Sequence, residues 1–188
     1  MRGGSRPLIV AIDGRSGAGK STLAAEAANR LAARGLPAAV IEGDDFYAGG
    51  SSIAWDERTP EDKARHVIDW RRQRPVLSHL RERRPAHWRP FDWAADEWDG
   101  PDPPLGAPTS CEPTAVVMLE GAYSGRPELA DLVDLRVLLD TPEPVRARRL
   151  RDREGEDYQV SWEGRWREAE NHYFSAVAPP DGFDLVIT

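Results

Sequence analysis

The chain has 188 residues, of which 40% are hydrophobic and 30% charged, a composition typical of one soluble globular domain with a substantial core. Its apolar runs are too short to cross a bilayer, and the N-terminal segment lacks the apolar stretch of a signal peptide. A net charge of −7 without a long basic run argues against nucleic acid as a partner, and a single cysteine, Cys111, excludes an internal disulfide and is typical of the cytoplasm.

Apolar runs and helical patterns alternate through the first half of the chain. Residues 7–13 form a short apolar run typical of a buried parallel strand, and the Ala-rich residues 19–35 predict a helix that stops at a glycine. A second strand is predicted over 37–45, where it ends in two carboxylates. Residues 59–72 open with Thr-Pro-Glu, which predicts the start of a helix.

The second half continues the same alternation after a proline-rich interruption. Residues 86–93 are predicted as a short strand, and residues 99–113, with five prolines and two glycines, as an irregular loop or distorted hairpin. Helices are predicted over 141–155 and over 160–177, the second interrupted at Gly164. Further strands are predicted over residues 114–121, 133–142 and 183–188.

This alternation predicts a single domain, residues 1–188, of the α/β class: a layered fold around a mostly parallel sheet. In such sheets, ligands bind at the carboxyl ends of the strands. Polar residues follow several predicted strands there, so these strand ends are expected to converge on one site. They are the loop 14–21, Asp44 and Asp45, Glu120 and Asp140.

The string Gly14-x4-Gly19-Lys20-Ser21 has the spacing of a phosphate-binding loop and lies between a predicted strand and a predicted helix. Backbone N–H groups of such a loop form a nest for phosphate, and the helix N-terminus adds partial positive charge. Lys20 is expected to bridge the β- and γ-phosphates, and the Ser21 hydroxyl to bind Mg²⁺. The predicted nucleotide-binding residues are Gly14, Ser16, Gly17, Ala18, Gly19, Lys20, Ser21 and Thr22.

Three further features fit phosphoryl transfer. The Asp44–Asp45 pair offers a carboxylate for an acceptor hydroxyl, or else caps a turn. Glu120 offers a carboxylate that holds Mg²⁺ through water, or else is an ordinary strand-end residue. Arg148 and Arg151 share a helix face and offer guanidinium groups to phosphate oxygens, unless that helix is simply solvated.

The ordered strings "GRSGAGKST", "GDDFY", "FDW", "LEG" and "RARRLRD" resemble the uridine kinase and phosphoribulokinase group of P-loop kinases, from about residue 8 to 155. The resemblance implies a three-layer, nucleoside-kinase-like P-loop NTPase fold, with five mostly parallel strands, helices on both faces, and the use of ATP and Mg²⁺. It implies an acceptor-site insertion at about 46–113 and a helical lid at about 145–160.

The resemblance also implies roles for single residues. Asp44 matches the general base, and the implied acceptor-site residues are Asp44, Tyr47, Phe91, Asp92 and Trp93. Arg148 and Arg151 match lid arginines that act on the transferring group.

Three departures from the family pattern concern the acceptor and the lid, while the phosphate loop is intact. Phe91 replaces a tyrosine, Asp96 lies where related kinases carry a base-contacting histidine, and the lid reads Glu154-Gly155-Glu156. The aromatic and acidic residues around 88–102 could bind a cationic ligand, or they could form a small aromatic core. Trp55, Trp70, Trp162 and Trp166 are interpreted as packing residues.

The sequence thus predicts an ATP- and Mg²⁺-dependent kinase that transfers the γ-phosphate to a hydroxyl of a small molecule, a nucleoside by resemblance. One alternative acceptor is a cationic alcohol. An alternative of another class is a nucleotide-binding regulator that no longer transfers phosphate. A homo-oligomer is compatible with the sequence.

Overall fold

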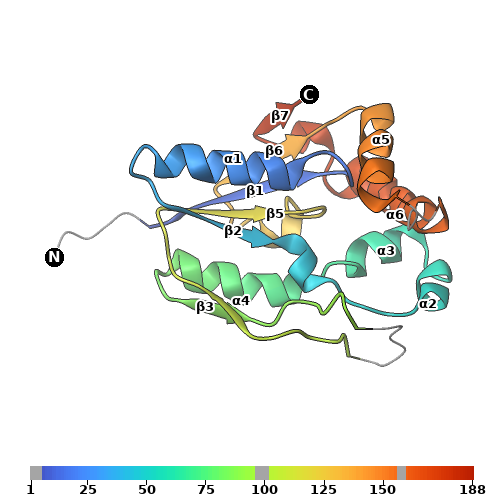
Figure 1. Ribbon diagram of the computed structural model, residues 1–188, viewed down its shortest axis with the longest axis horizontal. Coiled ribbons are helices and arrows are strands. Elements are labelled where there is room, and N and C mark those ends of the chain that lie inside the picture. Colours follow the sequence, from blue (N-terminus) through green and yellow to red (C-terminus); the bar gives the residue numbers. More distant parts are fainter. Residues whose placement is uncertain (1–5, 96–101, 156–159) are drawn as a thin grey trace.

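The computed structural model describes residues 6–95, 102–155 and 160–188. Five parallel strands form the central sheet in the order β2-β5-β1-β6-β7, with β1 in the middle (Figure 1). The strands are β1 (Leu8–Gly14), β2 (Ala38–Glu42), β5 (Val116–Glu120), β6 (Leu135–Leu139) and β7 (Leu185–Ile187). All five were predicted from the sequence, and the α/β fold with a five-stranded parallel sheet is confirmed.

The sheet has apolar cores on both of its faces because side chains alternate along each strand. In β1, Ile9 belongs to one cluster of buried residues, whereas Val10 and Ile12 belong to the other. Helix α1 (Lys20–Ala32) covers one face and α4 (Trp70–Arg81) the other, as Figure 1 shows. The remaining helices are α2 (Ser52–Asp56), α3 (Pro60–His66), α5 (Glu143–Glu154) and α6 (Val160–His172).

Shorter elements complete the fold. An antiparallel hairpin joins β3 (Ala86–Trp88), within the predicted strand 86–93, to β4 (Thr109–Cys111), so the proline-rich stretch 99–113 contributes one strand of a hairpin. A π-helical turn (Tyr173–Val177) follows α6. Single 3₁₀ turns occupy Gly43–Phe46, Pro127–Leu129 and Pro180–Gly182.

The predicted helix start at Thr59 is confirmed, because the Thr59 side chain caps α3, whereas two other details of the helix predictions differ from the structure. The predicted helix over 59–72 is two helices, because the backbone at Val67 and Asp69 pairs instead with the segment after β2: Ala48 N donates to Val67 O at 3.0 Å and Asp69 N to Phe46 O at 2.8 Å. Gly164 does not interrupt α6. An interior glycine costs a helix only about 1 kcal/mol, which the buried face of α6 against α3 offsets.

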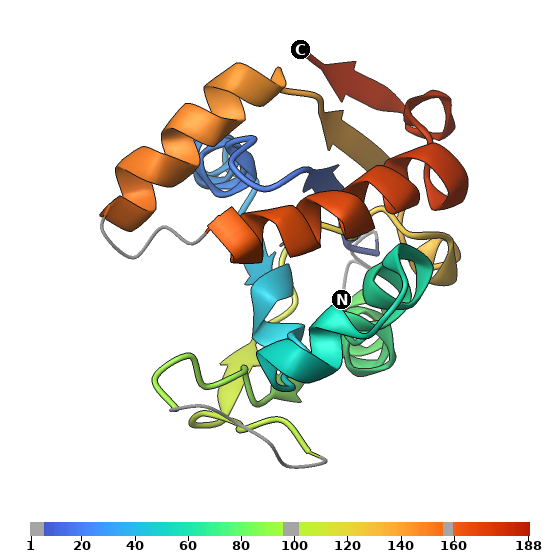
Figure 2. The same ribbon diagram turned by 90° about the vertical axis from the view of Figure 1, so that its right-hand side faces the viewer.

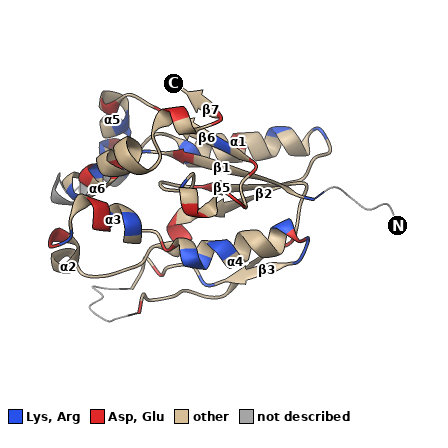
Figure 3. Ribbon diagram, turned by 180° about the vertical axis from the view of Figure 1, so that it is seen from behind, with Lys and Arg blue, Asp and Glu red and all other residues tan. Residues whose placement is uncertain are grey.

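Two basic residues of α4 form ion pairs with acidic residues outside the helix. Arg74 pairs with Asp131 at 2.7 Å, and Arg81 with Asp134 at 3.3 Å. Figure 3 shows basic and acidic segments interspersed over the helices. Within the described part of the chain, no helix combines the length and apolar character needed to span a membrane.

Candidate active site

The phosphate loop follows β1 at the carboxyl edge of the sheet, which Figure 2 views end-on with α5 and α6 around it. Side chains donate hydrogen bonds to carbonyl oxygens of the loop. Lys20 Nζ donates to Arg15 O at 3.1 Å, Thr141 Oγ1 to Ala18 O at 3.0 Å and Arg149 Nη1 to Ala18 O at 2.8 Å. These bonds fix the conformation of the loop backbone.

Glycine is required at two loop positions. Gly17 and Gly19 have φ values of +75° and +102°, in the left-handed region that favours glycine. A Cβ on Gly17 would lie 2.8 Å from Arg146 O and 3.0 Å from Leu150 Cγ, so α5 packs directly onto the loop. Gly19 caps α1 without a side-chain bond, which leaves the helix N-terminus open toward the loop.

The loop encloses a cavity of about 360 Å³ whose donor set fits a Mg²⁺-bound triphosphate. Its walls include Lys20, Ser21 and Glu120. Burial raises the pKa of Glu120, while the Ser21 side chain and the Lys20 charge oppose this shift. A hydroxyl beside a carboxylate, facing a lysine, matches the oxygen ligands of Mg²⁺ and leaves room for phosphate.

The predicted nucleotide-binding residues are distributed over three places. Ser16, Gly17, Gly19, Lys20, Ser21 and Thr22 line the loop cavity. Ala18 instead lines a neighbouring cavity of about 780 Å³ with Leu23, Thr141 and Arg149. Gly14 permits close packing of β1 on β6, since a Cβ there would lie 2.6 Å from Leu139 O. Asp140, expected at this site, is exposed and lines none of the described cavities.

The arginines of α5 that line the loop cavity are Arg149 and Arg153, not the predicted Arg148 and Arg151. Helix α5 packs on the loop through Leu150, which is buried, so positions 149 and 153 flank the contact. Position 151 lies about 200° around the helix axis from both. Arg148 and Arg151 are exposed and line none of the described cavities. The i, i+3 spacing put the two on one face of α5 but could not tell which face meets the loop.

Replacing Arg153 with alanine is expected to lower kcat by about 10²–10³-fold, because the loop cavity would lose a guanidinium group placed to stabilise negative charge on phosphate. Arg151→Ala, on the other side of the same helix, is the matched control, expected to stay within about threefold of wild type. Steady-state kcat at saturating substrates measures both. Equal losses in the two variants would restore the assignment made from the sequence.

Asp44 lies in the 3₁₀ turn Gly43–Phe46, which packs against the end of β5. A Cβ on Gly43 would lie 3.0 Å from Glu120 O, so the turn sits directly beside the carboxylate expected to hold Mg²⁺. Asp44 lines the loop cavity, whereas Asp45 accepts a hydrogen bond from Trp88 Nε1 at 2.7 Å. Burial raises the pKa of Asp45, and the Trp88 bond opposes this shift. Of the two neighbouring aspartates, Asp44 therefore faces the phosphate loop.

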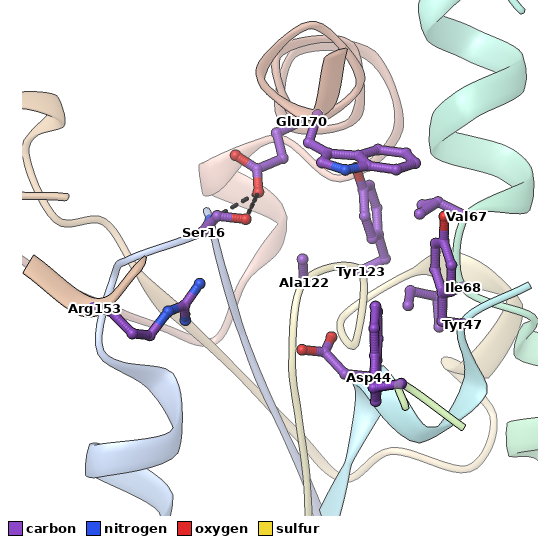
Figure 4. Close-up of a pocket in the computed structure, with 11 residues that line it drawn as sticks. Ser16, Asp44, Tyr47, Val67, Ile68, Ala122, Tyr123, Arg153 and Glu170 are labelled. Carbon is purple, nitrogen blue, oxygen red and sulfur yellow. Dashed lines mark hydrogen bonds between the residues drawn. The ribbon is translucent and has the colours of Figure 1, made fainter. Parts of the chain in front are cut away.

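A second cavity of about 390 Å³ opens beside the loop cavity, and Figure 4 shows side chains that line it. Four aromatic residues line it, and three of them contact one another: Tyr47 stacks on Trp93 with ring centroids 5.0 Å apart and meets Trp166 edge-on at 6.2 Å. Burial raises the pKa of Tyr47 to about 12. The lining residues are Ser16, Asp44, Tyr47, Val67, Ile68, Trp93, Ala122, Tyr123, Arg153, Trp166 and Glu170.

The predicted acceptor residues are only partly brought together. Asp44, Tyr47 and Trp93 line the second cavity, although Trp93 remains 57% exposed. Phe91 packs behind them, 4.9 Å from the Tyr47 ring. Asp92 does not line the cavity: it accepts a hydrogen bond from Ala94 N at 3.1 Å and closes a turn. Asp96 lies outside the described residues.

Trp166, Glu170 and Tyr123 are among the lining residues that were not anticipated from the sequence. Trp166 was interpreted as a packing residue but forms part of the cavity wall. Glu170, on α6, accepts bonds from Ser16 N and Ser16 Oγ, both at 2.7 Å, and so joins α6 to the phosphate loop. Tyr123 follows Glu120 by three residues in the turn after β5. The strand-end position of Tyr123 was a usable signal, whereas Glu170 carried none because surface helices are rich in glutamate.

Comparison with known proteins extends over most of the chain. Residues 9–160 match the model of the phosphoribulokinase / uridine kinase family. A uridine kinase from Leuconostoc citreum (strain KM20) is 26% identical over 160 residues, which are 80% of this chain and 70% of the relative. A uridine kinase from Clostridium botulinum (strain Langeland) is 28% identical over 151 residues, 78% of this chain and 69% of the relative.

Solved structures share the fold. A structure described as that of a possible uridine kinase from Bacillus stearothermophilus superposes with a TM-score of 0.71 at 19% identity, covering 100% of this chain and 91% of that one. The parallel sheet and its phosphate loop are therefore those of P-loop kinases.

Proposed function

The chain belongs to the phosphoribulokinase and uridine kinase family, and from that premise we propose that it transfers the γ-phosphate of ATP, bound with Mg²⁺, to a hydroxyl group of a nucleoside. One observation carries the proposal: the loop cavity and the aromatic-walled cavity share four lining residues. These are Ser16, Asp44, Ala122 and Arg153. Among these four, Asp44 supplies the carboxylate and Arg153 the cation.

The shared residues assign the chemistry. An acceptor hydroxyl in the aromatic-walled cavity meets Asp44, which takes its proton as the oxygen attacks the γ-phosphorus. The bond from the γ-phosphorus to the bridging oxygen breaks, and ADP leaves with that oxygen. Arg153 and Lys20 stabilise the negative charge on the transferring group. Ser21 and Glu120 would hold Mg²⁺, which neutralises charge on the phosphate oxygens. Positioning and electrostatics therefore supply the catalysis, and no covalent enzyme intermediate is needed.

A nucleoside fits the second cavity for two reasons. The rings of Tyr47, Trp93 and Trp166 offer stacking surfaces for a flat base. The cavity volume of about 390 Å³ is in the range of small-molecule sites. The cavity of about 780 Å³ on the other side of the loop, which includes Thr22 and Arg149, is the place for the ATP base and ribose.

A cationic alcohol is the second candidate acceptor, and one observation favours it. Two carboxylates, Asp44 and Glu170, line the same cavity as the aromatic rings. Aromatic faces and carboxylates together attract ammonium groups. The single arginine among the described lining residues, Arg153, faces both cavities and is committed to phosphate in the proposed mechanism.

An acceptor screen tests the proposal. Purified protein is mixed with ATP, Mg²⁺ and one compound at a time, from a panel of uridine, cytidine, adenosine, guanosine, choline and ethanolamine, and ADP formation is measured. ADP formation that depends on a nucleoside supports the proposal, and dependence on choline or ethanolamine selects the second candidate. Tight ATP binding without acceptor-dependent ADP formation would instead identify a nucleotide-binding regulator.

A further inference from the structure

Tyr123 carries a buried hydroxyl that has no hydrogen-bond partner. Among the described residues, buried side-chain atoms without a partner occur on Arg72, Gln73, Tyr123 and Ser124, and of these residues Tyr123 alone lines the acceptor cavity. The Tyr123 side chain is 3% exposed. A buried hydroxyl without a partner costs about 1–3 kcal/mol, so its retention in the wall of a binding cavity needs a reason.

The backbone holds Tyr123 in an unfavourable conformation at this place. Its φ of +69° lies in the left-handed region, which aromatic residues rarely adopt. Asp13, at the end of β1, fixes the turn: Tyr123 N donates to Asp13 Oδ1 at 2.9 Å, and Gly125 N donates to Oδ2 at 2.8 Å. The same carboxylate accepts from Gly14 N at 2.7 Å, so the turn is tied to the start of the phosphate loop.

The surroundings of the hydroxyl select the group that it can bind. Figure 4 shows the Tyr123 side chain extending from the turn after β5 toward the helix that carries Glu170. Burial, together with the charges of Glu170 and Asp13, raises the pKa of Tyr123, so the phenol stays protonated and can both donate and accept. A ligand carbonyl at this place would face the Glu170 carboxylate, whereas a ligand hydroxyl can accept from Tyr123 and donate to Glu170.

We propose that Tyr123 is a specificity-determining residue of the acceptor site, whose hydroxyl binds a second hydroxyl of the acceptor, distinct from the one that receives phosphate. The inference rests on the proposed function and narrows it to polyhydroxy acceptors, such as compounds with an intact ribose. A mono-alcohol cannot fill both positions. Choline and ethanolamine would therefore leave Tyr123 unpartnered and bind less tightly.

The test is Tyr123→Phe, which removes the hydroxyl and keeps the ring. Melting temperatures of wild type and variant are measured for the free proteins and with each compound of the acceptor panel. The panel is extended by 2′,3′-dideoxyuridine, which forms a matched pair with uridine. For an acceptor that the wild type phosphorylates, we expect its KM to rise roughly 3- to 20-fold while kcat and the ATP KM change little. The dideoxy compound should bind wild type and variant equally, because it lacks the hydroxyl that Tyr123 meets.

Tyr173→Phe is the matched control, since Tyr173 is also buried but donates its hydroxyl to Asp13 at 2.8 Å. We expect Tyr173→Phe to lower the melting temperature of the free protein and Tyr123→Phe to leave it unchanged or raise it. A lower melting temperature of the free Tyr123→Phe protein would overturn the inference. It would also be overturned if replacing uridine with 2′,3′-dideoxyuridine weakened binding equally in wild type and variant. Binding is read from melting temperature, so a failure of phosphoryl transfer would count against the proposed function separately.

Discussion

Asp44→Asn is expected to lower kcat by about 10²–10⁴-fold, the usual contribution of a positioned general base. Asparagine keeps the size of the side chain but cannot take the proton of the acceptor hydroxyl. Because Asp44 lies in a solvent-accessible seam between two cavities, the change should leave the fold and the binding of ATP nearly unaffected. Initial rates of acceptor-dependent ADP formation and calorimetric ATP binding measure the two effects.

Asp45→Asn is the matched control one residue away. Asp45 accepts from Trp88 Nε1 and lines neither the loop cavity nor the acceptor cavity. An asparagine oxygen can still accept that bond, so kcat should remain within about threefold of wild type while stability falls by up to about 1 kcal/mol. An Asp44→Asn enzyme that retained more than a tenth of the wild-type kcat would show that Asp44 is not the base.

The sequence predicted the parts of the molecule that local chemistry determines. Buried parallel strands appear as apolar runs, and all five strands of the central sheet were found in this way. The phosphate loop was recognised because its glycines and Lys20 occur at a fixed spacing between a strand and a helix, and Gly17 and Gly19 do adopt left-handed conformations. Asp44 was expected at the site because it follows the end of a predicted strand, and it does line the loop cavity.

Features that depend on tertiary packing were not predictable from the sequence. The face of α5 that meets the loop is decided by the contact of Leu150 with Gly17, so the sequence selected Arg148 and Arg151 where the structure presents Arg149 and Arg153. The break between α3 and α4 depends on pairing of Val67 with the segment after β2. Such contacts join residues far apart in the chain and leave no local pattern.

Asp13→Asn is expected to destabilise the protein by about 2–4 kcal/mol, the largest stability loss among the variants considered. Asp13 is fully buried, and its two oxygens accept from four donors: Gly14 N, Tyr123 N, Gly125 N and Tyr173 Oη. Burial raises the pKa of this carboxyl, and hydrogen bonds and the Lys20 charge oppose this shift. An amide replaces one acceptor oxygen with an N–H donor that faces donors already present.

The melting temperature should fall by roughly 4–16 °C, and urea unfolding gives the free energy directly. Tyr173→Phe removes one of the four bonds and should cost less, about 1 kcal/mol. The double variant should be less destabilised than the sum of the two, since Asp13 and Tyr173 are in contact. Strict additivity would contradict a shared network.

The same carboxylate connects the two halves of the candidate active site, because its donors belong both to the phosphate loop and to the turn that carries Tyr123. Asp13→Asn should therefore weaken ATP binding and acceptor binding together, although Asp13 lines neither cavity. Asp44→Asn should instead lower kcat with binding intact. An Asp13→Asn protein with a lower melting temperature that still binds both substrates as tightly as wild type would contradict this expectation. It would show that the turn keeps its conformation without the hydrogen bonds to Asp13.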